Sequence, residues 1–131
     1  MKEIIEELTG YLKTIEEFDK DMGQDASALH AYLIQLTNMG ARANFLMAEW
    51  KKKYREEKKR AYYKLAASEY ATQKYFAVAL AKDFIDSECN ETGYVYDLAE
   101  RTARACTHTQ SAIVTIVSSL KSERQFADYQ Q

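Results

Sequence analysis

The segment 51–60, KKKYREEKKR, carries the densest group of side chains that could bind a ligand. Seven of its ten residues are Lys or Arg and two are Glu, in a chain whose formal net charge is −2. Lysine and arginine bind phosphates and carboxylates, and arginine can do so through two parallel hydrogen bonds. These side chains can therefore bind an anion, provided that the cations share one face of a helix.

A helical wheel separates this segment into two surfaces. Lys52, Glu56 and Arg60 follow one another at i, i+4 spacing, and Lys53 stands in the same relation to Glu57. Opposite charges at this spacing stabilise an exposed helix by about 0.2–0.5 kcal/mol per pair. We therefore expect these five side chains to form a solvated face of a helix.

The remaining side chains form a second surface, which we call the basic stripe: Lys51, Arg55, Lys58, Lys59 and Tyr62. On a helix, three of the cations and the tyrosine fall within a sector of about 60°, and Lys59 lies beside them. The tyrosine ring offers a face on which a base or a cation can stack. No acidic residue of the same helix falls in this sector.

Two interpretations of the basic stripe stay open from the sequence. The first 50 residues carry four Lys or Arg against nine Asp or Glu, so the first helix could pack alongside and neutralise the stripe. The acidic residues that it would use are Glu6, Glu7, Glu16, Glu17 and Asp21. Alternatively, an anionic ligand binds there.

The scarcity of chain breakers predicts the fold class. The 131 residues contain no proline and four glycines, and 47% of them are hydrophobic. A β-rich fold needs many turns, which glycine and proline usually supply. We predict a single all-α domain, an elongated antiparallel bundle of three to four long helices with coiled-coil-like seams.

Apolar spacing places these helices at about 2–22, 26–67, 70–89 and 92–125. In the first, apolar residues recur at spacings of 4, 3, 4, 3 and 4 from Ile4 to Met22, as in a heptad seam. Gly23 is predicted to end that helix, and Asp25 or Ser27 to begin the next. The segment from Cys89 to Gly93 is predicted to separate the last two helices.

Catalytic and metal-binding constellations are missing from the sequence. His30 and His108 have no acidic residue at i±3 or i±4, and Cys106 and His108 would point about 200° apart on a helix. An acidic cluster lies near one helix end: Asp83, Asp86, Glu88 and Glu91. We expect these acids to be solvated, and we predict a protein that is not an enzyme and has no metal or cofactor.

The hydropathy of the chain and its leftover apolar residues predict its cellular location and its assembly. The sequence has no run of 18 apolar residues and no signal-peptide pattern, so we expect a cytoplasmic protein that does not enter a membrane, with Cys89 and Cys106 as reduced thiols. Several apolar residues fall outside the main seams: Tyr32, Phe45, Tyr63, Val78, Tyr96, Val114 and Val117. A narrow bundle cannot bury all of them, which favours a homo-oligomer.

The segment 99–127, AERTARACTHTQSAIVTIVSSLKSERQFA, resembles the C-terminal helix of small all-helical proteins encoded by tailed bacteriophages. The matching pieces are Arg104–Gln110, which has an extra Thr109 between its His and Gln, and the stretch Ser119-Leu-Lys-Ser-Glu. The resemblance implies the host cytoplasm as the location. It carries no catalytic motif, although some similar genes lie near phage recombination and replication genes.

These observations lead to a leading functional hypothesis and two alternatives. The first is sequestration of a small nucleotide-type ligand in basic and tyrosine-lined pockets between subunits, as a phage counter-defence protein. The second is an accessory protein of phage recombination or replication that binds single-stranded nucleic acid along the basic stripe. The third is a protein-interaction module. The pI of about 5.7 favours the small ligand, because an acidic protein repels a long polyanion outside its basic patch.

Overall fold

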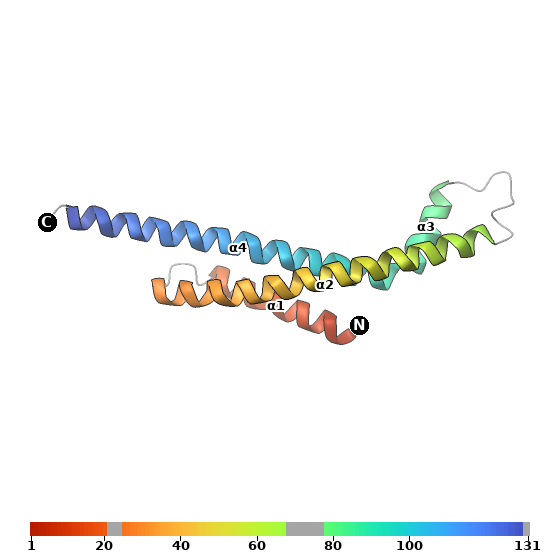
Figure 1. The fold of residues 1–131 in the computed structure, drawn as a ribbon, viewed down its shortest axis with the longest axis horizontal. Helices are drawn as coiled ribbons and strands as arrows, with labels where there is room; N and C mark the ends of the chain where they lie inside the picture. Colours follow the sequence, from red (N-terminus) through yellow and green to blue (C-terminus); the bar gives the residue numbers. More distant parts are fainter. Residues whose placement is uncertain (21–24, 68–77, 130–131) are drawn as a thin grey trace.

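The computed structural model describes residues 1–20, 25–67 and 78–129 as an elongated arrangement of helices (Figure 1). They are α1 (Lys2–Lys20), α2 (Ala26–Ala66), α3 (Val78–Glu88) and α4 (Asn90–Tyr129). Outside the helices, the structure describes only Met1, Asp25, Ala67 and Cys89. The all-α prediction is therefore confirmed, with one short helix, α3, among three long ones in the described residues.

Helix α2 follows the sequence pattern closely. Its N-cap is Asp25, whose Oδ1 accepts a hydrogen bond from the backbone N–H of Ala28 at 2.8 Å. A capping carboxylate of this kind satisfies one of the free N–H groups at a helix start. The expected end of the first helix at Met22, its cap at Gly23 and the expected third-helix residues 70–77 lie outside the described residues.

The predicted break between the last two helices is too long. Cys89 alone separates α3 from α4, and the backbone N–H of Gly93, in the first turn of α4, donates to the Cys89 carbonyl at 2.9 Å. Gly93 serves packing, since a Cβ there would lie 3.0 Å from Cε2 of Tyr54 on α2. The Tyr54 ring uses this space and stacks at 6.1 Å on the ring of Tyr96.

Helices α2 and α4 run antiparallel and form the long axis of the molecule (Figure 1). Cross-helix contacts mark the register: Thr92 meets Glu57 near one end, and Gln110 meets Thr37 farther along. Two hydrophobic clusters join this pair to α1, one around Leu8 and Trp50, the other around Phe18. The core thus lies where three helices meet.

Helix α1 covers only part of α2. It has 19 residues against the 41 of α2, and its N-terminus lies level with the middle of α2 (Figure 1). Beyond Trp50, α2 packs against α3 and the start of α4, through Ala61 and Leu65 among others. The segment 51–66 therefore keeps a large solvent-exposed surface.

Substitutions of two helical glycines test how tightly Tyr54 packs against α4. Gly10 lies on α1 with nothing within 4 Å of a Cβ, so Gly10→Ala should stabilise the protein by about 0.5–1 kcal/mol through helix propensity. Gly93→Ala should lack this gain, because the new methyl group pushes against the Tyr54 ring. Urea unfolding of both variants measures the difference. An equal gain at the two positions would contradict the tight approach of Tyr54 to Gly93.

Candidate functional site

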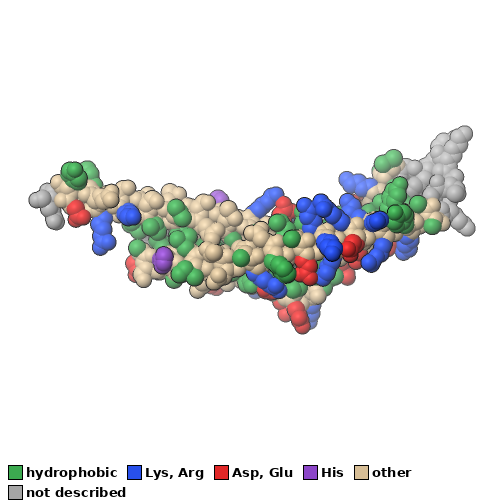
Figure 2. Space-filling model, viewed as in Figure 1, with side chains coloured by type: hydrophobic (Ala, Val, Ile, Leu, Met, Phe, Trp, Pro, Cys, Tyr) green, Lys and Arg blue, Asp and Glu red, His purple; other side chains and the backbone are tan. Residues whose placement is uncertain are grey.

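The structure places the basic stripe on the open surface of α2. Lys51, Arg55, Lys58 and Lys59 are exposed, and Tyr62 retains 61% of its accessible surface. Figure 2 shows Lys and Arg side chains gathered over the C-terminal half of α2. Within residues 1–20, 25–67 and 78–129, none of the four stripe cations forms an ion pair.

Helix α1 does not neutralise the stripe. Its Glu7 pairs instead with Arg42, nine residues before Lys51 on α2, and its Glu16 pairs with Lys20 of the same helix. Asp21 lies outside the described residues. Among the described residues, no acidic side chain of α1 pairs with a stripe cation, so this part of the structure does not support the first interpretation.

One of the two expected charge pairings on the other face of this segment, that of Lys53 with Glu57, does not form. Lys53 pairs with Glu49 at 3.5 Å, and its Nζ lies 4.2 Å from the centre of the Trp50 ring. Glu57 accepts a 2.7 Å hydrogen bond from the Thr92 hydroxyl, so the predicted Lys53–Glu57 pair is wrong. The buried Thr92 hydroxyl also lies 3.2 Å from the Cys89 carbonyl, so Glu57 is the nearer of its two acceptors.

Aromatic rings accompany the stripe. The Tyr62 and Tyr63 rings meet edge to face at 6.3 Å, and both are more than half exposed. The Lys58 ammonium lies 5.2 Å from the Tyr54 ring, which stacks on Tyr96. Rings placed among cations can hold a base while the cations hold its phosphates.

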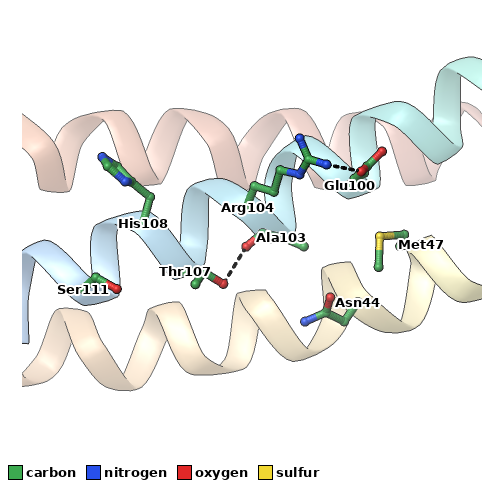
Figure 3. Close-up of a pocket in the computed structure, with 8 residues that line it drawn as sticks. All are labelled: Asn44, Met47, Glu100, Ala103, Arg104, Thr107, His108 and Ser111. Carbon is green, nitrogen blue, oxygen red and sulfur yellow. Dashed lines mark hydrogen bonds and ion pairs between the residues drawn. The ribbon is translucent and has the colours of Figure 1, made fainter.

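A second feature, which the sequence did not predict, is an open groove of about 610 Å³ between α2 and α4 (Figure 3). Its lining consists of Asn44, Met47, Glu100, Ala103, Arg104, Thr107, His108 and Ser111. None of these residues belongs to α1. The α4 residues follow one another at spacings of three, one, three, one and three, and that helical period is the signal that could have revealed the groove.

A smaller hollow of about 210 Å³ lies between α2 and α3. It contains Lys64 and Glu88, which form an ion pair at 3.3 Å, together with Glu57, Arg60 and Ala61. Its charges are mixed and partly paired within the chain. This hollow is therefore a weaker candidate site for an external anion than the basic stripe.

A partly buried network of polar side chains, which the sequence did not predict, fixes α1 against α2. Arg42 donates to both carboxylate oxygens of Glu7, at 2.8 and 3.3 Å, and the Tyr11 hydroxyl donates to Glu7 at 2.8 Å. The bond from Arg42 lowers the pKa of Glu7. Burial, reinforced by the bond to Glu7, raises the pKa of Tyr11. We call this network the clasp, because its hydrogen bonds join α1 to α2 through Glu7 and Arg42.

The cysteines and the acidic cluster show no reactive arrangement. Cys89 and Cys106 are free and buried, as expected for reduced thiols, and burial raises the pKa of each. A raised thiol pKa disfavours the thiolate that acts as nucleophile or metal ligand. In the part of the chain that the structure describes, no three His, Cys, Asp or Glu residues come together as a metal site.

Comparison with known proteins leaves the function open. No protein-family model, no curated protein and no solved structure matches the chain. In the described segments, no helix combines the length and the apolar character needed to cross a membrane.

The clasp predicts how stability depends on pH. Because folding lowers the pKa of Glu7, its ionised carboxylate stabilises the folded state. This stabilisation is complete above the pKa of the unfolded state, about 4.3, and disappears as the pH falls through the lower pKa of the folded state. Glu7→Gln should therefore be less stable than the parent at pH 7, and the gap should narrow near pH 3. Urea unfolding at the two pH values measures it. If the two proteins differ by the same free energy of unfolding at pH 3 as at pH 7, the charge of Glu7 is not the cause of the difference.

Proposed function

We propose that this protein is a non-enzymatic binding protein whose basic stripe binds the phosphates of a nucleotide-type ligand. One observation carries the proposal: four exposed cations, Lys51, Arg55, Lys58 and Lys59, share a surface with Tyr62 and form no ion pair with the described residues. An anion with several charges and a stackable ring matches this set of groups.

The electrostatics of α2 support this proposal. Lys51 and Arg55 are four residues apart, as are Arg55 and Lys59, and like charges at this spacing destabilise a helix by about 0.2–0.5 kcal/mol per pair. Bound phosphates would remove this repulsion and form charge-assisted hydrogen bonds. A stripe that served only solubility would gain from interspersed acids, which it lacks.

Because the basic stripe lies on an open surface, it suits an extended strand of nucleic acid better than a small nucleotide. Small ligands usually lose about 70–90% of their surface in a concave site. No stripe cation lines the groove between α2 and α4 or the hollow between α2 and α3. Single-stranded nucleic acid needs only a cationic path and stacking faces, so an accessory role in recombination or replication suits the single chain better.

A small nucleotide is the second candidate, and it requires a second copy of the chain to close the site. The observation that favours it is the exposure of large apolar side chains on α2 and α3, namely Tyr62, Tyr63, Val78 and Leu80. A second subunit that covered these side chains would also enclose one side of the basic stripe. Sequestration of a signalling nucleotide, the counter-defence hypothesis, rests on this assembly and on the resemblance to phage proteins.

Charge reversal in the stripe tests the shared chemistry. Lys51→Glu or Arg55→Glu should weaken binding of a fluorescent oligothymidylate by about tenfold or more at low salt, because each removes a phosphate contact and adds a repulsive charge. Lys13→Glu is the matched control, since Lys13 is exposed on α1, away from the stripe. Fluorescence anisotropy measures the affinities. Equal loss in the control, or no binding of any nucleotide ligand by the parent, would contradict the proposal.

Light scattering tests the second candidate. If subunits close the nucleotide site, the protein at tens of micromolar should have a mass that is a multiple of 15.1 kDa, and Tyr62→Ala should lower that mass. A small nucleotide should then raise the melting temperature and keep doing so in moderate salt. A mass of one chain with and without nucleotide would rule out a site between subunits.

A further inference from the structure

The groove between α2 and α4 continues the line of the basic stripe. Asn44 of the groove, Lys51 and Lys58 follow one another at seven-residue spacing on α2, so they lie on one side of the helix. Met47, also in the groove, is one turn from Lys51. No residue of α1 lines this side. A ligand that leaves the stripe toward the N-terminus of α2 therefore enters the groove.

The α4 wall of the groove adds polar and cationic groups to this path. Arg104 and His108 are exposed there, and Ala103 and Thr107 are small enough to leave space between the two helices (Figure 3). The Arg104 guanidinium has five N–H donors, and its side chain is 79% exposed. Among the described residues, it donates one hydrogen bond, to Glu100, and so keeps donors for a phosphate.

We propose that the basic stripe and the α2–α4 groove form one continuous track for a single-stranded nucleic acid. This proposal rests on the proposed function and names its ligand class. Phosphates would meet Lys51, Arg55 and Lys58 first and Arg104 farther along, while bases face Tyr62 at one end and the groove at the other. A small nucleotide would occupy only one part of this track.

The dimensions of the track suit a strand of several nucleotides. From Tyr62 to Asn44, α2 advances about 27 Å at 1.5 Å per residue. At the roughly 3.4 Å rise per nucleotide of a stacked strand, this length holds about eight nucleotides. An oligonucleotide of about four should therefore fit on the stripe alone, and one of about 12 should also fill the groove.

The carboxylate of Glu100 is the one acidic group that lines the groove. Its Oε1 lies 2.6 Å from Nη2 of Arg104, four residues along α4, and this pair lowers the negative charge that an incoming phosphate meets. A substitution of Arg104 would remove a cation and also free Glu100 to repel the strand. Arg104 is thus the groove residue at which the effect on binding should be largest.

The test compares short and long oligothymidylates, of about 4 and about 12 nucleotides, on variants of the groove and of neighbouring surfaces. Arg104→Gln should weaken the long strand by about threefold or more and lower its salt slope by about 0.7, the value for one phosphate contact in a single strand. The short strand should be unaffected. Arg101→Gln is the matched control on α4, exposed and outside the groove lining.

A second pair of variants tests the α2 wall with a minimal change of volume. Asn44→Asp places a negative charge in the line of the stripe, whereas Asn38→Asp places it on an exposed site about 120° away around the same helix. Only Asn44→Asp should weaken the long strand, again by about threefold or more. Thermal melts confirm that all four variants are folded.

The possible outcomes separate the two proposals. If Lys51→Glu abolishes binding of both strands while Arg104→Gln and Asn44→Asp change neither, the stripe binds the ligand and the groove proposal is wrong. If the long strand binds no more tightly than the short one, the groove proposal is also wrong. If the parent binds neither strand, the proposed function fails in this form and the track fails with it.

Discussion

The antiparallel pairing of α2 with α4 is the contact on which the rest of the structure depends. Both helices are about 40 residues long, and small side chains along their seam, such as Gly40, Gly93 and Ala99, let them approach closely. Cys106 packs against Gly40, and Tyr54 packs against Gly93. Helix α1 has 19 residues, so it can add a third layer along only part of this pair. The difference in length leaves the stripe half of α2 open.

This arrangement separates the charges that hold the fold together from those that remain available. Glu7, Arg42 and Tyr11 satisfy one another across α1 and α2, and Lys64 pairs with Glu88 across α2 and α3. The stripe cations lie between these two contacts along α2 and take part in neither. Partial burial strengthens the Glu7–Arg42 pair, whereas the stripe cations are exposed and gain most from a multivalent partner.

The groove changes how the stripe is interpreted. Considered alone, the stripe is a convex cationic surface that could attract nucleotides, nucleic acids or acidic proteins. In the proposed track, the stripe continues into the groove that carries Arg104 and His108, which gives the surface a direction along the α2–α4 seam. An extended ligand can use both parts at once, and the gain in affinity comes from linked contacts on one molecule.

The sequence by itself determined the all-α class, the bounds of α2 and the placement of the stripe cations on one side of that helix. Local physics accounts for this success: proline is absent, Asp25 caps its own helix, and the helical period sorts Lys51 and Arg55 to one side. Of the apolar residues outside the seams, Phe45, Tyr63, Val78 and Val114 are exposed, but Tyr32, Tyr96 and Val117 pack against the core.

Only the tertiary structure decided which elements meet. The Glu7–Arg42 pair joins residues 35 apart, Glu57 bonds to Thr92 instead of Lys53, and the groove joins residues near 44 to residues near 104. The registers of α1 and α4 along α2 set these partners, and those registers depend on how complementary side chains fit across helices. A helical wheel describes one helix at a time, so it can give the face of a residue but not what that face contacts.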